Sequence, residues 1–453
     1  MLIIWLVIFA MIFVYNYAKY KEEGILYCFI TLYLFWPPAF GIKGLPFNRL
    51  LLILFLLFSL WRHQFKVRLS CCDKRLLKIL VVILSSMLIV FVYTWVFEST
   101  EFVDIINFVI DDILLVSVLI SEINTMDKID RCLNAVVGSS ILYFICGIIQ
   151  AITSVNLCDS LFLTIKPIVL TKRFGLTRIS VTQSPITYGY YCVCFIVILM
   201  YLYNKTKKKI YKVLAYLGSM CVVLSISRGA ILLLILYYLY YFLINIRKMV
   251  SQQKLQNIFI GLIIVLGGGM LFIIANRELF NTIMEIISAT LNVFNKGKTF
   301  TGLENNDAYS SRMTQIVSAI EWNKYNNKSL FGFGMNAYKN DLIKWKWTYN
   351  NTWVDSVTND TGYGDILVYG GFIYLISYIG LFILYTLKAI KSLVRNDYFV
   401  KQVIIIWIAM FWICNIQSIF FDYNLTNFMS SIIITYFINM MYIGDIKNGE
   451  SNS

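Results

Sequence analysis

Long apolar runs separated by short polar loops make up most of this chain. An α-helix needs about 20 apolar residues to cross a hydrocarbon core about 30 Å thick. Membrane β-barrel strands alternate over only about 10 residues, so the pattern predicts helices. About 12–13 spans are expected, at roughly 2–18, 24–40, 46–61, 76–97, 102–121, 132–153, 185–203, 210–226, 229–246, 257–275, 364–387, 402–420 and 427–444.

One long polar stretch, residues 276–363, interrupts the apolar pattern late in the chain. The chain therefore divides into three parts. Residues 1–275 are predicted to form membrane helices with short loops, including a longer loop at 154–184. Residues 276–363 form one large loop, and residues 364–453 form the C-terminal membrane helices and a tail.

Composition supports a polytopic integral membrane protein of the all-α class. Hydrophobic residues make up 59% of the 453 residues, and charged residues only 14%. A soluble domain typically has about 25% charged residues, so a soluble fold is disfavoured. The 102–121 segment carries Asp104, Asp111 and Asp112, and is therefore either bundle-facing or interfacial.

The net charge of +14 follows membrane topology and does not indicate nucleic-acid binding. Lys and Arg cluster in four loops that fall on one side if the predicted spans alternate, and that side is cytoplasmic by the positive-inside rule. These loops are 62–78, 204–212, 247–254 and 388–401. The 154–184 loop, the turn near Ser227 and the 276–363 loop then lie on the extracytoplasmic side.

Metal and cofactor sites are not expected from the spacing of ligand residues. The ten cysteines are scattered, mostly in apolar runs, and His63 is the single histidine. No metal-ligand spacing results from this distribution.

Arginines on the predicted outer side stand against the positive-inside pattern, so each requires an explanation. Arg173 and Arg178 lie in the 154–184 loop, and Arg228 lies in the sequence Ser225-Ile-Ser-Arg-Gly229 between two spans. Guanidinium groups bind phosphate oxygens bidentately, which suits a diphosphate lipid head group. The alternatives are head-group anchoring, a structural ion pair, or snorkelling to the interface.

Two further groups of candidate residues lie in the large loop. Arg312 follows Ser310 and Ser311 and precedes a helical pattern, and taken alone is more often solvated than functional. Asn359, Asp360 and Tyr363 lie at the entry to the 364–387 span. A carboxylate beside an apolar wall can act as a general base. The alternative is helix capping by Asp360 or Thr361.

Together these motifs resemble the O-antigen polymerase (Wzy) and O-antigen ligase (WaaL) family of membrane glycosyltransferases. The resemblance is carried by Arg173–Pro185, Ser225–Gly229, Ser311-Arg312, Phe331-Gly-Phe-Gly334 and Asp360–Gly371, which cover about the second half of the chain. It implies a GT-C-like membrane fold with one large extracytoplasmic loop. Ligases of this family typically have a His-Asn pair where this chain reads Asn359-Asp360-Thr361, so polymerase is favoured over ligase.

The resemblance implies a donor glycan on undecaprenyl diphosphate, in the outer leaflet of a bacterial cytoplasmic (inner) membrane. Partners would be this lipid-linked oligosaccharide and membrane lipid, with a chain-length regulator protein as a further candidate. Arg228 and Arg312 would stabilise charge on the diphosphate, with Arg173 and Arg178 as substrate-binding residues. Asp360 would act on the acceptor hydroxyl, and Asn359 and Tyr363 would bind substrate. No metal or cofactor would be needed.

Three other functions compete with the polymerase hypothesis. A lipid-linked oligosaccharide flippase would place basic residues along a central cavity within the spans. A ligase would use a different acceptor, and a non-catalytic scaffold would tolerate Arg312→Ala with full function.

Overall fold

The computed structural model describes most of the helical part of the chain. The described residues are 2–36, 41–42, 45–62, 73–161, 172–173, 176–182, 184–249, 308–346, 353–355, 361–394, 397–415 and 424–440. The predicted span at 257–275 therefore lies outside the described residues, as do Asn359 and Asp360.

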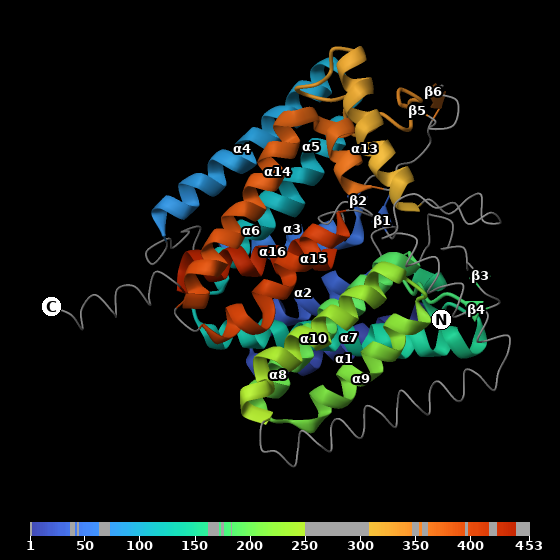
Figure 1. Cartoon of the computed structure of the whole chain (residues 1–453). Coiled ribbons are helices and arrows are strands. Elements are labelled where there is room, and N and C mark those ends of the chain that lie inside the picture. The colour runs from blue at the N-terminus through green and yellow to red at the C-terminus, as the bar shows by residue number, and fades with distance from the viewer. Residues whose placement is uncertain are drawn as a thin grey trace.

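Helices form nearly all of the regular structure in these ranges (Figure 1). The α-helices are α1 (Leu2–Tyr20), α2 (Glu23–Phe35), α3 (Phe47–Arg62), α4 (Lys74–Phe97), α5 (Phe102–Phe108), α6 (Leu115–Glu122), α7 (Met126–Thr153), α8 (Pro185–Thr206), α9 (Lys209–Leu224), α10 (Arg228–Met249), α13 (Ala308–Tyr325), α14 (Gly362–Val394), α15 (Ile405–Cys414) and α16 (Asn424–Thr435). Shorter turns of π or 3-10 helix are η1 (Val109–Leu114), η2 (Leu157–Leu161), η3 (Val400–Ile404) and η5 (Tyr436–Met440).

Six short strands form three antiparallel pairs in the described loops. They are β1 (Gly41–Ile42) with β2 (Leu45–Pro46), β3 (Lys172–Arg173) with β4 (Leu176–Thr177), and β5 (Lys344–Lys346) with β6 (Trp353–Asp355). In register, Arg173 pairs with Leu176 and Lys344 pairs with Asp355. These hairpins lie in the segments between the helices, and none of them forms part of the core of the helical bundle.

Five of the described helices are long and apolar enough to cross a membrane: α1, α4, α7, α8 and α14. Shorter apolar helices include α2, α10, the η3–α15 helix and the α16–η5 helix. This composition indicates a membrane-embedded helical protein, as the sequence predicts. The 102–121 segment is one apolar helix interrupted by η1, with Ile110 and Leu115 in the core.

Local sequence explains where several helices begin. Ser184 precedes Pro185, and its hydroxyl accepts a hydrogen bond from the Thr187 amide, which is a standard N-cap with proline in the first turn. Asp73 caps α4 and also binds Lys388 of α14 at 3.0 Å. Burial by itself raises the pKa of the Asp73 carboxyl, but hydrogen bonds from the Leu76 amide and Lys388 lower that pKa below its ordinary value.

The core is built around α8, which is buried along most of its length against α7 and α9. Tyr143 of α7 makes ring contacts with Tyr188, Tyr191 and Phe195 of α8. Gly218 of α9 lets this helix approach closely, because a Cβ there would lie 2.7 Å from the Phe144 ring. Aromatic packing and small residues therefore hold the centre of the bundle together.

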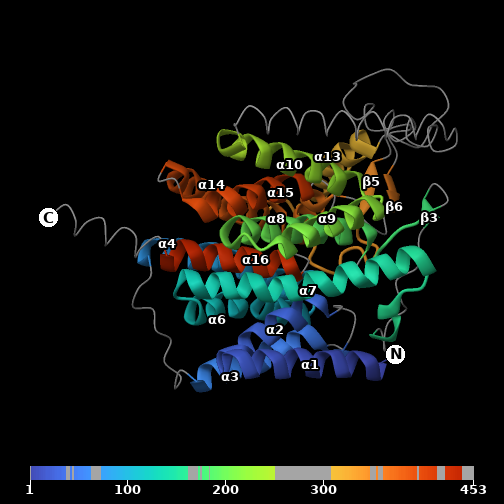
Figure 2. The same cartoon turned by 90° about the horizontal axis from the view of Figure 1, so that it is seen from below.

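The helix termini gather at two opposite ends of the bundle. Figure 2 shows α13, β3, β5 and β6 at one end, here called the α13 end. Hydrogen bonds at the other end join the last turn of α16–η5 to α6 and α4: Asn439 donates to the Ile120 and Ile123 carbonyls, and the Asp73 amide donates to Ile438. That second end is called the α6 end.

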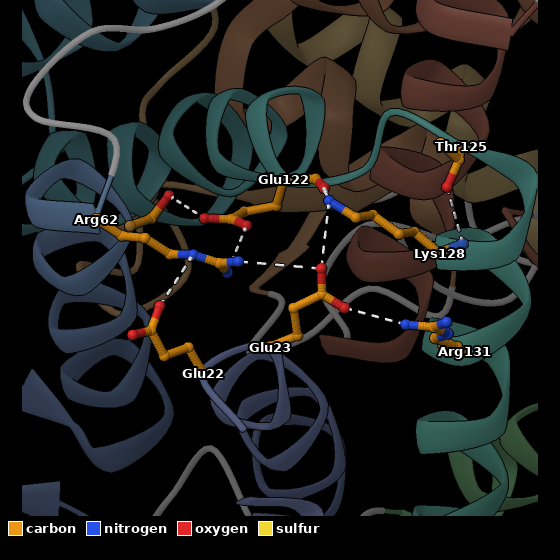
Figure 3. Close-up of polar contacts among 8 residues, drawn as sticks. Glu22, Glu23, Arg62, Glu122, Thr125, Lys128 and Arg131 are labelled. Carbon is orange, nitrogen blue, oxygen red and sulfur yellow. Dashed lines mark hydrogen bonds and ion pairs between the residues drawn. The ribbon is translucent and has the colours of Figure 1, made fainter. Parts of the chain in front are cut away.

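An ion-pair network ties four helices together at the α6 end (Figure 3). Arg62 of α3 lies 3.5 Å from the buried Glu122 carboxylate and 3.9 Å from Glu23. Glu23 also pairs with Arg131 of α7 at 3.0 Å and with Lys128 at 3.7 Å. The network closes this end of the bundle with charges of both signs.

Candidate active site at the α13 end

Helix α14 is broken at Gly370-Gly371, the two residues that end the Asp360–Gly371 segment of the family resemblance. Gly371 has φ 61° and ψ −157°, a conformation that only glycine adopts readily. The break leaves backbone amides and carbonyls without partners inside the helix, and in an apolar bundle such groups must be satisfied by other segments.

The segment that fills this break is residues 328–335, here called the docking segment. The Phe333 amide donates to the Val368 carbonyl at 2.7 Å, and the Gly334 amide donates to Tyr369 at 3.1 Å. In return, the Phe372 amide donates to Ser329 at 2.8 Å. Gly332 has φ 69°, and a Cβ there would lie 2.5 Å from the Val368 oxygen. The Phe-Gly-Phe-Gly motif is therefore the part of the chain that completes α14.

The docking segment also binds the turn between α4 and α5. Ser99 donates to the Phe333 carbonyl through both its amide and its hydroxyl. The Met335 amide donates to the Thr100 hydroxyl at 3.1 Å, and Lys328 pairs with Glu98. Helix α13, which begins just before Arg312, packs on α14 (Figure 1). The described part of the polar loop is thus seated firmly on the bundle.

The first turn of α14 is held from two sides. The buried Thr361 hydroxyl accepts from the Gly364 amide at 2.9 Å, so Thr361 serves as a cap. The half-buried Tyr363 donates its amide to the Asn415 carbonyl at 3.2 Å. Asp365 accepts a hydrogen bond from the Tyr338 hydroxyl at 2.9 Å. Of the two capping candidates, Thr361 is described and caps, while Asp360 lies outside the described residues.

A second cluster at the same end brings together two segments that are far apart in sequence. The Arg178 guanidinium donates through Nε to the Ser225 carbonyl at 3.1 Å, and the Ile179 amide approaches the Leu224 carbonyl. Arg178 therefore lies against the turn that joins α9 to α10. Arg228 is the first residue of α10, directly after this turn.

Both segments contain a β-branched residue in left-handed backbone conformation. Val181 has φ 54° and Ile226 has φ 51°. Such values are rare for β-branched residues, cost about 1–3 kcal/mol, and concentrate at functional sites. Val181 is held by Gln150, whose side chain accepts its amide at 3.0 Å, and by Asn156, which donates to its carbonyl at 2.7 Å.

Ser227 adds an unsatisfied polar group to this cluster. Ser227 is only 2% exposed, and its hydroxyl has no hydrogen-bond partner among the described residues. An unpaired buried hydroxyl costs about 1–3 kcal/mol, so a native structure retains one only for a reason. Close packing of α8 confines the turn, because a Cβ at Gly189 would contact Ser225, Ser227 and Ala230. The Ser227 hydroxyl is suited to donate to a bound polar ligand.

Some of the predicted site residues lie at the α13 end, and others lie outside the described residues. It brings Arg178 to the turn before Arg228, and it places Arg312 in α13 and Tyr363 at the start of α14, all at the α13 end. Arg173 lies in β3, which pairs with β4 in the same 154–184 loop that holds Arg178. The backbone positions of Arg173, Arg228 and Arg312 are described, and their side chains are not. Asn359 and Asp360 lie outside the described residues.

Sequence reasoning missed the α4–α5 turn as the seat of the docking segment. Glu98-Ser99-Thr100-Glu101 is a polar interruption between two apolar runs, and this interruption is the feature of the sequence that marks the turn. Within the described ranges, no group of three or more His, Cys, Asp or Glu side chains is placed to hold a metal ion. A scan of family models gives no match for this chain, and a search of curated proteins gives none either.

Proposed function

We propose that this protein is a polysaccharide repeat-unit polymerase that builds O-antigen or capsule. It would transfer a glycan from an undecaprenyl-diphosphate-linked donor to a sugar hydroxyl on a second lipid-linked unit. One observation carries the proposal: Arg178 donates a hydrogen bond to the Ser225 carbonyl in the strained α9–α10 turn, and Arg228 follows this turn directly. Two arginine-bearing segments, about 50 residues apart, are thereby held at one end of a membrane bundle.

Charge distribution supports an outward-facing α13 end in the cytoplasmic membrane. The opposite ends of the apolar helices carry Arg62, Lys205, Lys208 and Lys388. Lys and Arg collect on the cytoplasmic side of membrane proteins, so the α6 end would face the cytoplasm. Lipid-linked repeat units would then reach the α13 end from the outer leaflet.

The proposed reaction uses arginines in place of a metal. The acceptor hydroxyl oxygen attacks the anomeric carbon and forms the new glycosidic bond. The bond from that carbon to the diphosphate oxygen breaks, and its electron pair leaves with the lipid diphosphate. Arg178, Arg228 and Arg312, with Arg173 nearby, would stabilise this charge, since guanidinium groups bind phosphate oxygens in pairs. Asp360 would take the acceptor proton, with Asn359 and Tyr363 binding the acceptor sugar.

The proposal is tested by the surface glycan of a deletion strain carrying plasmid-borne variants. Single repeat units without a ladder are expected in the deletion strain, and the wild-type gene should restore the ladder. Arg228→Lys and Arg312→Lys should each remove chain extension, because lysine cannot make the bidentate contact. Arg131→Lys is the matched control, since Arg131 lies in the ion-pair network at the α6 end. Full-length ladders from both lysine variants would rule out the arginine clamp.

A flippase remains the second candidate, because one charged pair lies within the bundle. The partly buried side chains of Arg49 and Asp111 form an ion pair between two apolar helices, as charged groups of transporters commonly do. The same deletion strain separates the two functions. A flippase defect should remove all repeat units from the surface, whereas a polymerase defect leaves single units.

A further inference from the structure

The docking segment packs on the outward face of α4, a helix that lies at the edge of the bundle (Figure 1). Val82, Ile89 and Phe97 of α4 are each more than half exposed. Tyr93 lies on the same stripe, because positions 82, 89, 93 and 97 share one face of a helix. The Phe331 ring stacks on Tyr93 with ring centroids 4.0 Å apart. Since α4 is apolar and long enough to cross a membrane, Phe331 lies where lipid would otherwise cover this stripe.

This aromatic contact lies below the polar end of α4. The helix ends at Phe97, and Glu98 follows as the first charged residue of the α4–α5 turn. At about 1.5 Å per residue, Tyr93 lies about 7–8 Å below Glu98 along the helix axis. Interfacial elements bury their apolar side chains to about 5–10 Å in a bilayer. Leu330, the residue before Phe331, is 59% exposed, so an apolar side chain at the tip of the docking segment is not covered by protein.

Polar contacts hold the chain on both sides of this apolar tip. Lys328 pairs with Glu98, and Asn336 donates to Asp104 at 3.0 Å. Between them, residues 332–334 are buried, and two of their amides donate to carbonyls of α14. Non-helical backbone is tolerated at membrane depth only where protein surrounds and bonds it. The segment therefore has the properties of a short re-entrant loop, polar at its ends and apolar at its tip.

We infer that Leu330 and Phe331 insert into the lipid bilayer beside α4. The sequence predicts one extracytoplasmic loop over residues 276–363, whereas this surface fits the acyl chains of a membrane. Its tip carries no charge, and its apolar side chains continue the outward stripe of α4. The inference depends neither on the proposed polymerase activity nor on which end of the bundle faces the cytoplasm.

The first test uses the purified, unaltered full-length protein in nanodiscs of phosphatidylcholine and phosphatidylglycerol. A hydrophobic diazirine that partitions into acyl chains is photolysed, and tryptic peptides are analysed by mass spectrometry. We expect label on Leu330 in the peptide Ser329–Lys339, as on the exposed side chains of α4. The adjoining peptide Asn340–Lys344, which begins with two exposed polar residues, should stay unlabelled. Labelled α4 beside an unlabelled Ser329–Lys339 would overturn the inference.

A spin label at Leu330→Cys distinguishes lipid from a protein partner at this surface. The label should collide often with dissolved O₂ and rarely with an aqueous nickel chelate. Ile89→Cys on the outward face of α4 is the membrane control, and Asn340→Cys is the water control. All three are made with Cys71 and Cys72 replaced by serine, because the eight native cysteines that the structure describes are buried.

Each result of the spin-label experiment decides the matter. Access to the nickel chelate equal to that of Asn340→Cys would place Leu330 in water and overturn the inference. Poor access to both reagents would also overturn it, because a second copy of the chain or another protein would then cover the tip. A melting temperature near that of the unaltered protein shows that a variant is folded, and photolabelling of the unaltered chain decides if Leu330→Cys is not.

Discussion

At the scale of single residues, unusual backbone and unsatisfied polar groups lie at the α9–α10 turn. Ile226 adopts a left-handed conformation, and the next residue, Ser227, has a buried hydroxyl without a partner among the described residues. Each feature costs free energy that the bundle must offset by packing elsewhere. Residues that reduce stability in this way are expected where a ligand is bound, because binding recovers the missing hydrogen bond.

Ser227→Ala distinguishes a ligand-binding hydroxyl from a structural one. The change removes an unsatisfied buried group, so unfolding stability should stay equal or rise by up to about 1–2 kcal/mol. Surface glycan should nevertheless become shorter if the hydroxyl binds the substrate. Thermal unfolding of the purified variant and a gel of its glycan measure the two effects. A clear loss of stability would show that Ser227 is structural.

At the scale of elements, α14 and the docking segment form one unit although no short stretch of sequence contains both. The break at Gly371 exposes backbone groups, and residues 328–335 satisfy them through Val368, Tyr369 and Phe372. The same residues bind the α4–α5 turn. Hydrogen bonds therefore hold α14, the docking segment and the α4–α5 turn together.

Gly371→Ala should destabilise the protein through this unit. A Cβ would lie 2.5 Å from the Leu330 carbonyl, and the φ/ψ region of Gly371, which essentially only glycine occupies, costs another residue about 1–3 kcal/mol. We expect a lower Tm and faster proteolysis between α13 and α14. Gly380→Ala is the control on the same helix, because its Cβ meets no atom within 4 Å. That variant should be neutral or gain up to about 1 kcal/mol from helix propensity. Equal behaviour of the two variants would contradict the docking role.

At the scale of the whole molecule, the bundle has two chemically different ends. Mostly backbone hydrogen bonds, with the Lys328–Glu98 ion pair, hold the docking segment at the α13 end. A connected network of ion pairs that includes Arg62, Glu122 and Glu23 closes the α6 end. The apolar helices between them indicate a membrane-embedded body. Which end faces the cytoplasm follows from the distribution of Lys and Arg and remains a prediction.

Cysteine labelling in intact cells tests that orientation. Asn340→Cys introduces an exposed thiol at the α13 end and should react with a membrane-impermeant maleimide. Lys208→Cys places an exposed thiol between α8 and α9, at the α6 end, and should react only after the membrane is permeabilised. The unaltered chain is the control, since the eight native cysteines that the structure describes are buried. The reverse pattern of labelling would invert the topology.

Local sequence determined the helices of this protein, whereas tertiary structure decided which loops meet. Helix positions depend on runs of apolar residues, a local property, so the predicted 102–121 and 185–203 spans reappear as 102–122 and α8. The sequence also located the arginine-bearing segments and the glycine motifs. It could not show that Phe333 completes a helix broken at Gly371, or that Arg178 reaches the Ser225 carbonyl. These contacts depend on how helices distant in sequence pack, because only packing brings unsatisfied backbone groups to their partners.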